Sequence, residues 1–137
     1  MALLVPSRVK FRKAFRGKRG GVATRGNEIS FGAFALKSED SAWISARQIE
    51  AARRAMTRFT QRGGRIWIRI FPHRPITQKG SQATMGGGKG IPEYYVAAVH
   101  PGTIIFEMDG VSEAEARKAM TLAGYKLSVK TKFIVKD

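Results

Sequence analysis

The chain has 137 residues, 43% of them hydrophobic, and its 25 Lys and Arg against 10 Asp and Glu give a formal net charge of +15. This length suits one compact domain with a real core, while so large a charge repels itself and favours a polyanionic partner. The absence of cysteine excludes disulfides, Cys-ligated zinc and a thiol nucleophile. No apolar run approaches the roughly 18 residues of a membrane span, so we expect no membrane partner.

The excess charge lies in two segments. Residues 1–27 hold eight basic residues and no acid, and residues 51–92 hold nine basic residues and no acid. The other two segments, 28–50 and 93–137, carry nearly balanced charge. A solvated surface mixes the two signs, so this segregation predicts two nucleic-acid-binding segments.

Residues 1–27 are predicted to form a flexible basic arm, because they are rich in Gly, Arg and Lys. Phe11 and Phe15 have two open roles, packing on the domain or stacking on bases. A transit peptide for an organelle would share this composition, but we favour the arm. The arm residues expected to contact phosphate are Arg8, Lys10, Arg12, Lys13, Arg16, Lys18, Arg19 and Arg25.

Residues 29–37 are predicted to form a strand, in which Gly32 indicates a bulge or a close approach of backbones. Residues 38–44 are predicted to form a loop. Within that loop we expect Trp43 to be a core or lid residue rather than a stacking platform.

The clearest helix is predicted from Ser45 to Arg62. Ser45 and Gln48 form a capping box, and Gly63-Gly64 is expected to end the helix. At helical spacing, one apolar face is predicted to comprise Ile49, Ala52, Met56 and Phe59.

The opposite side of this helix carries arginines. Only Glu50 is available to pair with them, through Arg54 four residues later. A solvated face balanced by salt bridges therefore explains little, and we expect a guanidinium row that binds phosphate. Its members are Arg47, Arg53, Arg54, Arg58 and Arg62.

Residues 65–71 alternate strictly between isoleucines and other residues, which predicts a strand. The second face carries Arg65, Trp67, Arg69 and Phe71. If this face is exposed, its aromatic and guanidinium planes suit base stacking. If a helix covers it, Trp67 belongs to the core, and we favour the covered arrangement for Trp67. We expect Arg69 to contact nucleic acid.

Residues 72–92 are predicted to be an extended loop, because prolines and glycines punctuate them. The glycines allow backbone N–H groups to approach phosphates closely. The order is not that of a P-loop, since Gly90 follows Lys89. The residues expected to bind nucleic acid here are Arg74, Lys79 and Lys89.

The C-terminal part predicts further regular structure. We expect a hairpin of Tyr94–His100 and Thr103–Asp109 around Pro101-Gly102, a helix from Ser112 to Gly124, and a last strand over 126–136. The helix is predicted to bury Ala116, Ala119, Met120 and Ala123. Irregular interleaving of strands with two helices predicts an α+β fold around a mixed or antiparallel sheet. We expect residues 28–137 to form one nucleic-acid-binding domain.

No pattern of an active site is present in the sequence. His73 and His100 lack a nearby nucleophile or metal-ligand arrangement, and Glu107 with Asp109 is a weak catalytic signal. We therefore expect no enzyme activity, no catalytic residues, no metal and no cofactor.

The chain resembles the large-subunit ribosomal protein sixteen family of bacterial and plastid type, in one unbroken order along nearly its whole length. The stretches that carry the resemblance are Lys10-Phe11-Arg12-Lys13 with Gly17-Lys18-Arg19-Gly20, Ser30-Phe31-Gly32, residues 46–58, Ile66-Trp67-Ile68-Arg69 with Phe71-Pro72, Met85-Gly86 with Gly88-Lys89-Gly90, Glu93-Tyr94 with Val96-Ala97, and Lys130-Thr131 with Phe133.

The resemblance implies a hammerhead-type α+β domain that binds large-subunit ribosomal RNA near the A site and the peptidyl transferase centre, and that helps position tRNA. It implies tRNA and neighbouring large-subunit ribosomal proteins as partners. We expect a cytoplasmic ribosome rather than an organellar one. The alternative function is that of an architectural RNA- or DNA-binding protein outside the ribosome.

Three positions depart from the family pattern. His73-Arg74 stands where an acid and a lysine are usual, and Gly80 stands where a proline is usual. Thr84 replaces an arginine that some family members hydroxylate, so that modification cannot occur here and the loop has one charge fewer.

Overall fold

The structure is a computed structural model that describes residues 26–77 and 92–137. In these residues, two antiparallel sheets accompany two helices. The first sheet has the order β3-β6-β1-β7 and the second has the order β2-β5-β4. The first sheet contains β1 (Phe34–Ser38), β3 (Arg65–Ile68), β6 (Ile104–Asp109) and β7 (Thr131–Val135); the second contains β2 (Ala42–Ser45), β4 (Arg74–Thr77) and β5 (Pro92–Val99). The helices are α1 (Ala46–Phe59) and α2 (Glu113–Gly124).

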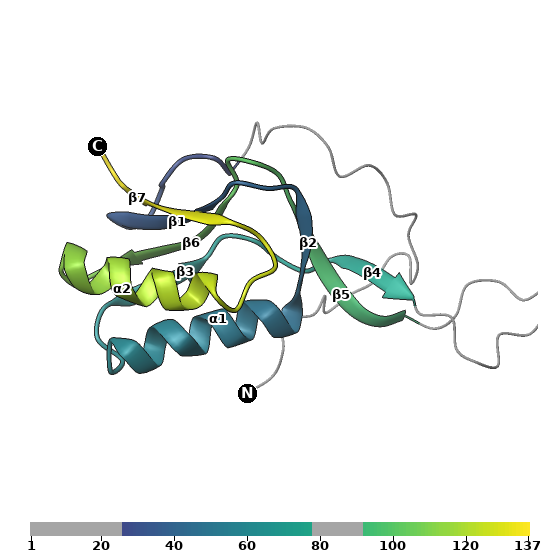
Figure 1. Cartoon of the computed structure of the whole chain (residues 1–137), viewed down its shortest axis with the longest axis horizontal. Helices are drawn as coiled ribbons and strands as arrows, with labels where there is room; N and C mark the ends of the chain where they lie inside the picture. Colours follow the sequence, from purple (N-terminus) through teal and green to yellow (C-terminus); the bar gives the residue numbers. More distant parts are fainter. Residues whose placement is uncertain (1–25, 78–91) are drawn as a thin grey trace, which may run out of the picture.

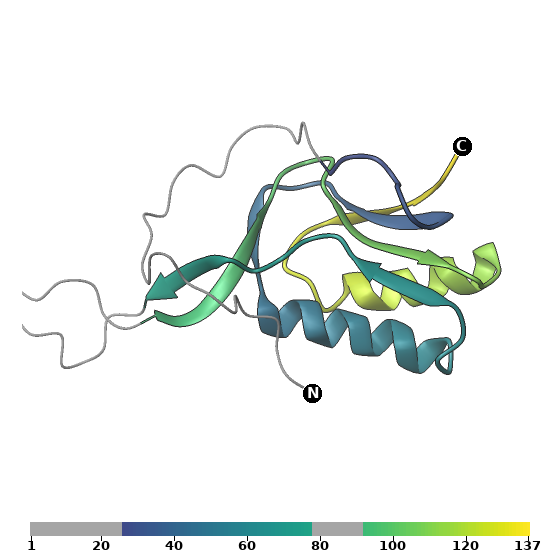
Figure 2. The same cartoon turned by 180° about the vertical axis from the view of Figure 1, so that it is seen from behind.

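The helices form one layer. Figure 1 and Figure 2 show α1 and α2 side by side on one face of the four-stranded sheet. The core lies between these layers, where Ile49 and Met56 of α1 meet Phe106 and Met108 of β6. Burial of these apolar faces is the main driving force for the arrangement. The α+β prediction is confirmed, and every strand pairing among the described residues is antiparallel.

The helix starts follow the predicted caps. Ser45 accepts a hydrogen bond from the Gln48 N–H at 3.2 Å, and the Gln48 side chain accepts one from the Ser45 N–H at 2.9 Å. Ser112 caps α2 by accepting from the Glu115 N–H at 3.2 Å. All four residues predicted to be buried on α2 are fully buried, namely Ala116, Ala119, Met120 and Ala123.

The predicted end of α1 is wrong by three residues. The helix stops at Phe59, and Gln61 and Arg62 turn into the left-handed region with φ of 54° and 67°. The Arg62 N–H closes this turn by donating to the Thr57 carbonyl at 3.0 Å. Phe59, predicted on the buried face, is 38% exposed because the helix ends there beyond the sheet-covered core.

The predicted hairpin has the right strands but the wrong pairing. β5 pairs with β2 and β4, whereas β6 pairs with β1 and β3. The turn between them is bound to the end of β1, since the Ser38 N–H donates to the Thr103 carbonyl and the Gly102 N–H donates to the Ser38 carbonyl, each at 2.8 Å. The chain therefore changes sheets at Pro101-Gly102.

Part of the predicted loop 72–92 is a strand. β4 pairs with β5 and lies at the edge of its sheet, where Pro75 can be accommodated without its missing N–H disrupting an interior ladder. In Figure 1, β4 and β5 extend together away from the helices. The rest of that loop, residues 78–91, and residues 1–25 of the predicted arm lie outside the described residues.

Three other boundaries differ from the predictions. β1 begins at Phe34 because the residues before it curl around a buried carboxylate instead of extending. β2 occupies part of the predicted loop 38–44, where it pairs with β5. The last strand is confined to Thr131–Val135, the residues that pair with β1. No helix in the described part is long and apolar enough to cross a membrane.

Candidate nucleic-acid interface

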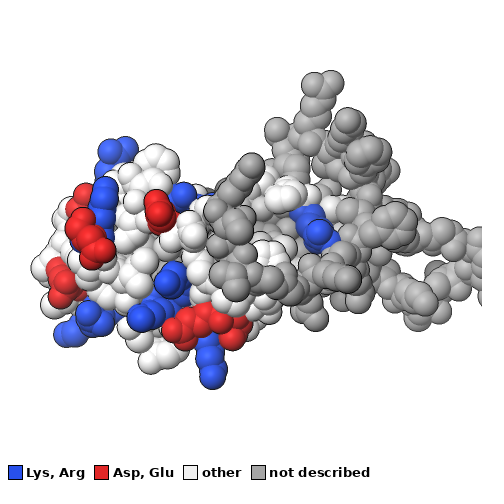
Figure 3. Space-filling model, turned by 90° about the horizontal axis from the view of Figure 1, so that it is seen from above, with Lys and Arg blue, Asp and Glu red and all other residues white. Residues whose placement is uncertain are grey.

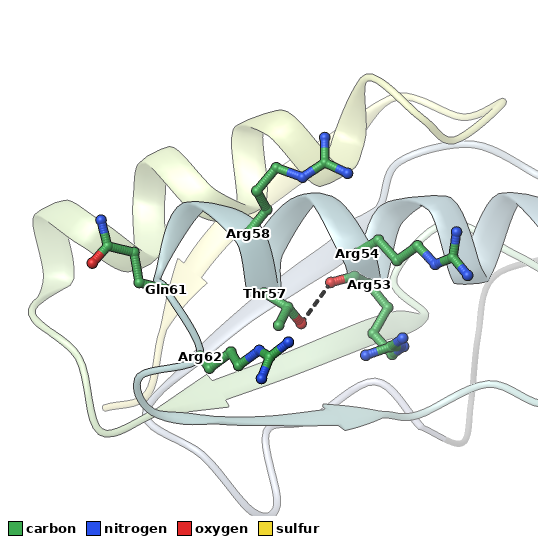
Figure 4. Close-up of a pocket in the computed structure, with 6 residues that line it drawn as sticks. All are labelled: Arg53, Arg54, Thr57, Arg58, Gln61 and Arg62. Atoms are coloured by element: carbon green, nitrogen blue, oxygen red, sulfur yellow. Dashed lines mark hydrogen bonds between the residues drawn. The ribbon is translucent and has the colours of Figure 1, made fainter. Parts of the chain in front are cut away.

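A groove lined by guanidinium groups runs along the C-terminal half of α1. Its volume is about 710 Å³, and the residues that line it are Arg53, Arg54, Thr57, Arg58, Gln61 and Arg62. Figure 4 shows Arg53, Arg54, Thr57 and Arg58 on α1, with Gln61 and Arg62 at the turn after the helix. The sequence predicted its four arginines but not Thr57 or Gln61.

The left-handed turn after Phe59 brings Arg62 into this groove. Thr57 supports the turn twice, because its carbonyl accepts from the Arg62 N–H at 3.0 Å and its hydroxyl donates to the Arg53 carbonyl at 2.9 Å. Arg62 thus lines the groove although it is not part of the helix. No sequence signal marks this turn, since neither Gln61 nor Arg62 is a residue that favours positive φ.

Glu50 pairs with two of the arginines. Its main partner is Arg53, which the sequence did not indicate as a partner of Glu50. Arg53 donates to the Glu50 carboxylate at 2.7 Å and 3.1 Å, while the predicted partner Arg54 approaches only to 3.3 Å. The bond to Arg53 lowers the pKa of Glu50 against the effect of burial, and the same bond raises the pKa of Arg53. Arg54 stays 56% exposed and Arg58 and Arg62 are exposed, so these three carry the available charge.

On the other face of the first sheet, Glu107 is completely buried beneath the segment that enters β1. Its carboxylate accepts hydrogen bonds from the backbone N–H groups of Ser30, Phe31 and Gly32 at 2.7–3.2 Å. Arg69 forms an ion pair with the same carboxylate. Burial alone would raise the pKa of Glu107, but the three N–H groups and the guanidinium outweigh it and lower the pKa.

Gly32 makes this arrangement feasible. A Cβ at Gly32 would lie 2.6 Å from the Met108 carbonyl oxygen, so the close backbone approach predicted there is confirmed. Sequence reasoning treated Glu107 only as a weak catalytic signal. An acid flanked by buried apolar residues on a strand is the signal that could have indicated a structural role.

The remaining predicted RNA-binding residues lie in different settings. Arg47 is exposed in the first turn of α1 and does not line the groove. Arg69 is held by Glu107 and also donates to the Glu28 carbonyl at 3.2 Å. Arg74 lies over the Trp43 ring at 5.9 Å. Ten predicted residues fall outside the described part of the chain, namely Arg8, Lys10, Arg12, Lys13, Arg16, Lys18, Arg19, Arg25, Lys79 and Lys89.

Neither helix of the described residues covers Trp67, contrary to the favoured prediction. Ile66 and Ile68 pack towards the core and the helices, so Trp67 lies on the opposite face, where it is half-buried and stacked on Phe31. Arg65, which the sequence placed on the same face of the strand, lies over the Trp67 ring. In Figure 3, which views the molecule from above, basic and acidic side chains are interspersed over the described surface. The segregated arginines of the α1 groove contrast with this mixture.

The residues that the structure describes contain no cluster of three potential metal ligands. His73 is exposed and contacts the Phe71 carbonyl, while His100 lies at the turn between β5 and β6.

The two-sheet α+β fold and the guanidinium groove on α1 together define a class of protein. It is a basic α+β protein suited to binding a polyanion.

The comparisons with known proteins are specific. Residues 6–134 match the family of ribosomal protein L16p/L10e. Three relatives bear the name large ribosomal subunit protein uL16c. The one from Spirogyra maxima is 58% identical over 133 residues, covering 97% of this chain and 93% of the relative. That from Paulinella chromatophora is 57% identical, covering 97% and 91%, and that from Pleurastrum terricola is 58% identical, covering 98% and 97%.

The chain therefore belongs to the ribosomal protein L16p/L10e family, as the resemblance predicted. Members of this family are structural components of the ribosome and not enzymes, which confirms the prediction that the chain is not an enzyme. The expectation that an organellar ribosome is the less favoured setting is not borne out, because all three relatives share the name uL16c.

Proposed function

We propose that this protein, a structural constituent of the large ribosomal subunit, binds the ribosomal RNA of that subunit through the guanidinium groove of α1. The proposal includes a position near the A site and the peptidyl transferase centre, where the protein would help position tRNA. The single observation that carries the RNA contact is the convergence of Arg54, Arg58 and Arg62 on one groove with one buried acid beside it.

The groove suits a phosphate backbone for two reasons. Arg54 and Arg58 are one helical turn apart, about 6 Å along the axis, so they present guanidinium groups in a row. Each guanidinium that contacts a phosphate releases condensed counterions. This release contributes favourably to the free energy of binding, and the contribution becomes smaller as the salt concentration rises. Arg53 has a different role, because its bond to Glu50 fixes it and neutralises part of its charge.

The basic arm and the glycine-rich loop extend this proposal beyond the described residues. Arms of this composition order on a phosphate backbone, so residues 1–27 and the lysines of residues 78–91 would add contacts at a distance from α1. Removal of residues 1–20 would then weaken RNA binding and make its salt dependence shallower.

The groove is tested by binding the purified protein to a large-subunit RNA fragment from the tRNA-site region at several salt concentrations. We expect Arg54→Gln, Arg58→Gln and Arg62→Gln together to lower the slope of log affinity against log salt by about three, roughly one per lost phosphate contact. The control for each of these changes is Arg117→Gln, which removes one arginine charge from α2, where Arg117 lies over Phe133 at 4.6 Å.

The control should leave the slope unchanged, because Arg117 makes no proposed phosphate contact. An equal loss of slope per arginine removed in the triple variant and in the control would contradict a specific role for the groove. Sucrose-gradient sedimentation provides the second arm of the test, since a protein acting outside the ribosome would not travel with large subunits. Equal affinity for bulk RNA of the same length would contradict the proposed position in the subunit.

A further inference from the structure

The face of the first sheet opposite the helices carries an aromatic pair flanked by arginines. The Phe31 and Trp67 rings stack with their centroids 6.1 Å apart and an interplanar angle of 20°. The Arg65 guanidinium lies 5.4 Å from the Trp67 ring centre, and the Arg69 guanidinium lies 5.3 Å from that of Phe31. Phe31 thus joins three side chains of residues 65–69 in one layer, in which two stacked rings are flanked by two guanidinium groups. We call this layer the aromatic platform.

The platform is held in place before any partner binds. Three backbone N–H groups of residues 30–32 donate to Glu107, and the Ala33 N–H donates to the Met108 carbonyl at 3.1 Å. Arg69 is fixed by the same carboxylate and by the Glu28 carbonyl. Because these groups are already ordered, a ligand that stacks on them loses little conformational freedom of the protein.

The exposure of Phe31 is not explained by folding. Its side chain is 59% exposed, the largest value for a phenylalanine in the described part of the chain, although its backbone is among the most tightly bonded. Together with the Trp67 ring and the guanidinium groups beside it, this ring forms an apolar patch with a polar rim, which is typical of a contact site. Arg65 beside it is exposed and has no ion pair within the residues that the structure describes.

We propose that the aromatic platform is a second RNA-binding site, which stacks an unpaired nucleobase on Phe31 and Trp67 and places the adjoining phosphate near Arg65. This inference deepens the proposed function and rests on it for the choice of RNA as the partner. A flat ring fits a base because every base has a π face, and guanidinium planes also stack on bases. A duplex cannot use the platform, since its bases are already stacked on one another.

The groove and the platform contribute different kinds of interaction to RNA binding. The groove of α1 contributes phosphate contacts, which salt weakens. The platform contributes stacking, which salt affects little, and its cation Arg69 is already neutralised by Glu107.

The test uses Trp67 as its own reporter. The protein has two tryptophans, so Trp43→Phe leaves Trp67 as the only one. We expect a short single-stranded oligoadenylate to quench the fluorescence of Trp67 in a saturable manner, at a salt concentration high enough to suppress phosphate contacts. A fully paired RNA duplex should produce no such quenching.

Phe31→Leu in this background should weaken the oligoadenylate affinity about tenfold, because base–ring stacking contributes roughly 1–3 kcal/mol per base. Phe31→Tyr should retain the affinity, which separates loss of stacking from loss of folding. The matched control is Phe59→Leu, the same change at a half-exposed ring on α1. It should leave the quenching unchanged.

Three results would overturn the inference: no quenching by oligoadenylate, equal quenching by the duplex, or the same loss in both Phe→Leu variants. Quenching by a proline-rich peptide but not by RNA would also overturn it, in favour of a protein partner. The groove proposal and the platform proposal can be contradicted independently of each other. If the triple arginine variant keeps its salt slope while oligoadenylate still quenches Trp67, the groove proposal fails and the platform stands.

Discussion

At the residue scale, Glu107 connects three parts of the chain. It lies on β6 and binds the segment that enters β1, together with Arg69 just after β3. An isolated buried carboxylate is costly, but several hydrogen bonds and a paired guanidinium offset that cost. The ion pair thus has a role in positioning Phe31, which the sequence alone did not indicate.

Glu107→Gln should therefore destabilise the protein strongly. The substitution removes the charge that Arg69 faces and places an amide among backbone donors, so we expect the free energy of unfolding to fall by about 3–5 kcal/mol. Urea denaturation measures this change. Asp109→Asn, at an exposed acid two residues along β6, should change it by less than about 0.5 kcal/mol. A similar small effect of both substitutions would show that the buried pair contributes nothing.

The lowered pKa of Glu107 also predicts an acid limb in the stability curve. A carboxyl with a lower pKa in the folded state stabilises the fold above its unfolded pKa, about 4.3, and loses that contribution as the pH falls towards the folded pKa. Between about pH 4.3 and the folded value, stability should decline in the unaltered protein. Glu107→Gln should make this decline shallower. Glu50 contributes to the same decline, because its pKa is lowered as well.

At the element scale, α1 both forms the core and presents the groove. Its start was predictable because a capping box is local, and its buried face was predictable from the spacing of Ile49, Ala52 and Met56. Its end was not predictable, because the left-handed turn at Gln61 and Arg62 has no sequence signal.

Ser45→Ala should lower the free energy of unfolding by about 1 kcal/mol, because the Gln48 N–H loses its acceptor. Ser112→Ala is the matched change at the start of α2 and should cost a similar amount. Thermal or urea denaturation checks both. RNA affinity of the folded Ser45→Ala protein should be unchanged, since no groove arginine moves. A loss of affinity without a loss of stability would contradict this separation of roles.

At the scale of the whole molecule, the two sheets and the helices separate the candidate RNA surfaces. The groove lies on α1. The platform lies on the far side of the first sheet, because Ile66 packs towards the core and the helices while Trp67, the next residue on β3, lies on the opposite face. An RNA that contacts both surfaces would have to pass around the domain. That arrangement suits a protein embedded in folded RNA better than one lying on a straight duplex.

Arg58→Gln and Phe31→Leu should therefore be additive in their effects on the free energy of binding to the large-subunit fragment, within about 0.5 kcal/mol. Arg58→Gln with Arg62→Gln forms the matched pair of neighbours in one groove, and it should depart from additivity by more than that. Filter binding of the single and double variants measures both sums. Strong coupling between Arg58 and Phe31 would indicate that the two surfaces are one site.

Local patterns in the sequence determined much of this protein. They indicated the α+β class, the capped helix starts, the buried faces of both helices and the arginines of α1, because helical spacing, caps and alternation involve residues close together in the chain. The charge segregation likewise predicted a polyanionic partner before any fold was known.

Only the tertiary structure decided how the pieces meet. The transfer of the chain between sheets at Pro101-Gly102, the pairing of β4 at an edge, and the position of Phe31 on Trp67 depend on contacts between residues far apart in sequence. The acid-free segment 51–92 appeared uniform as a sequence. The fold divides it, because Glu50 engages Arg53 and Glu107 engages Arg69, while Arg54, Arg58 and Arg62 remain exposed to a partner.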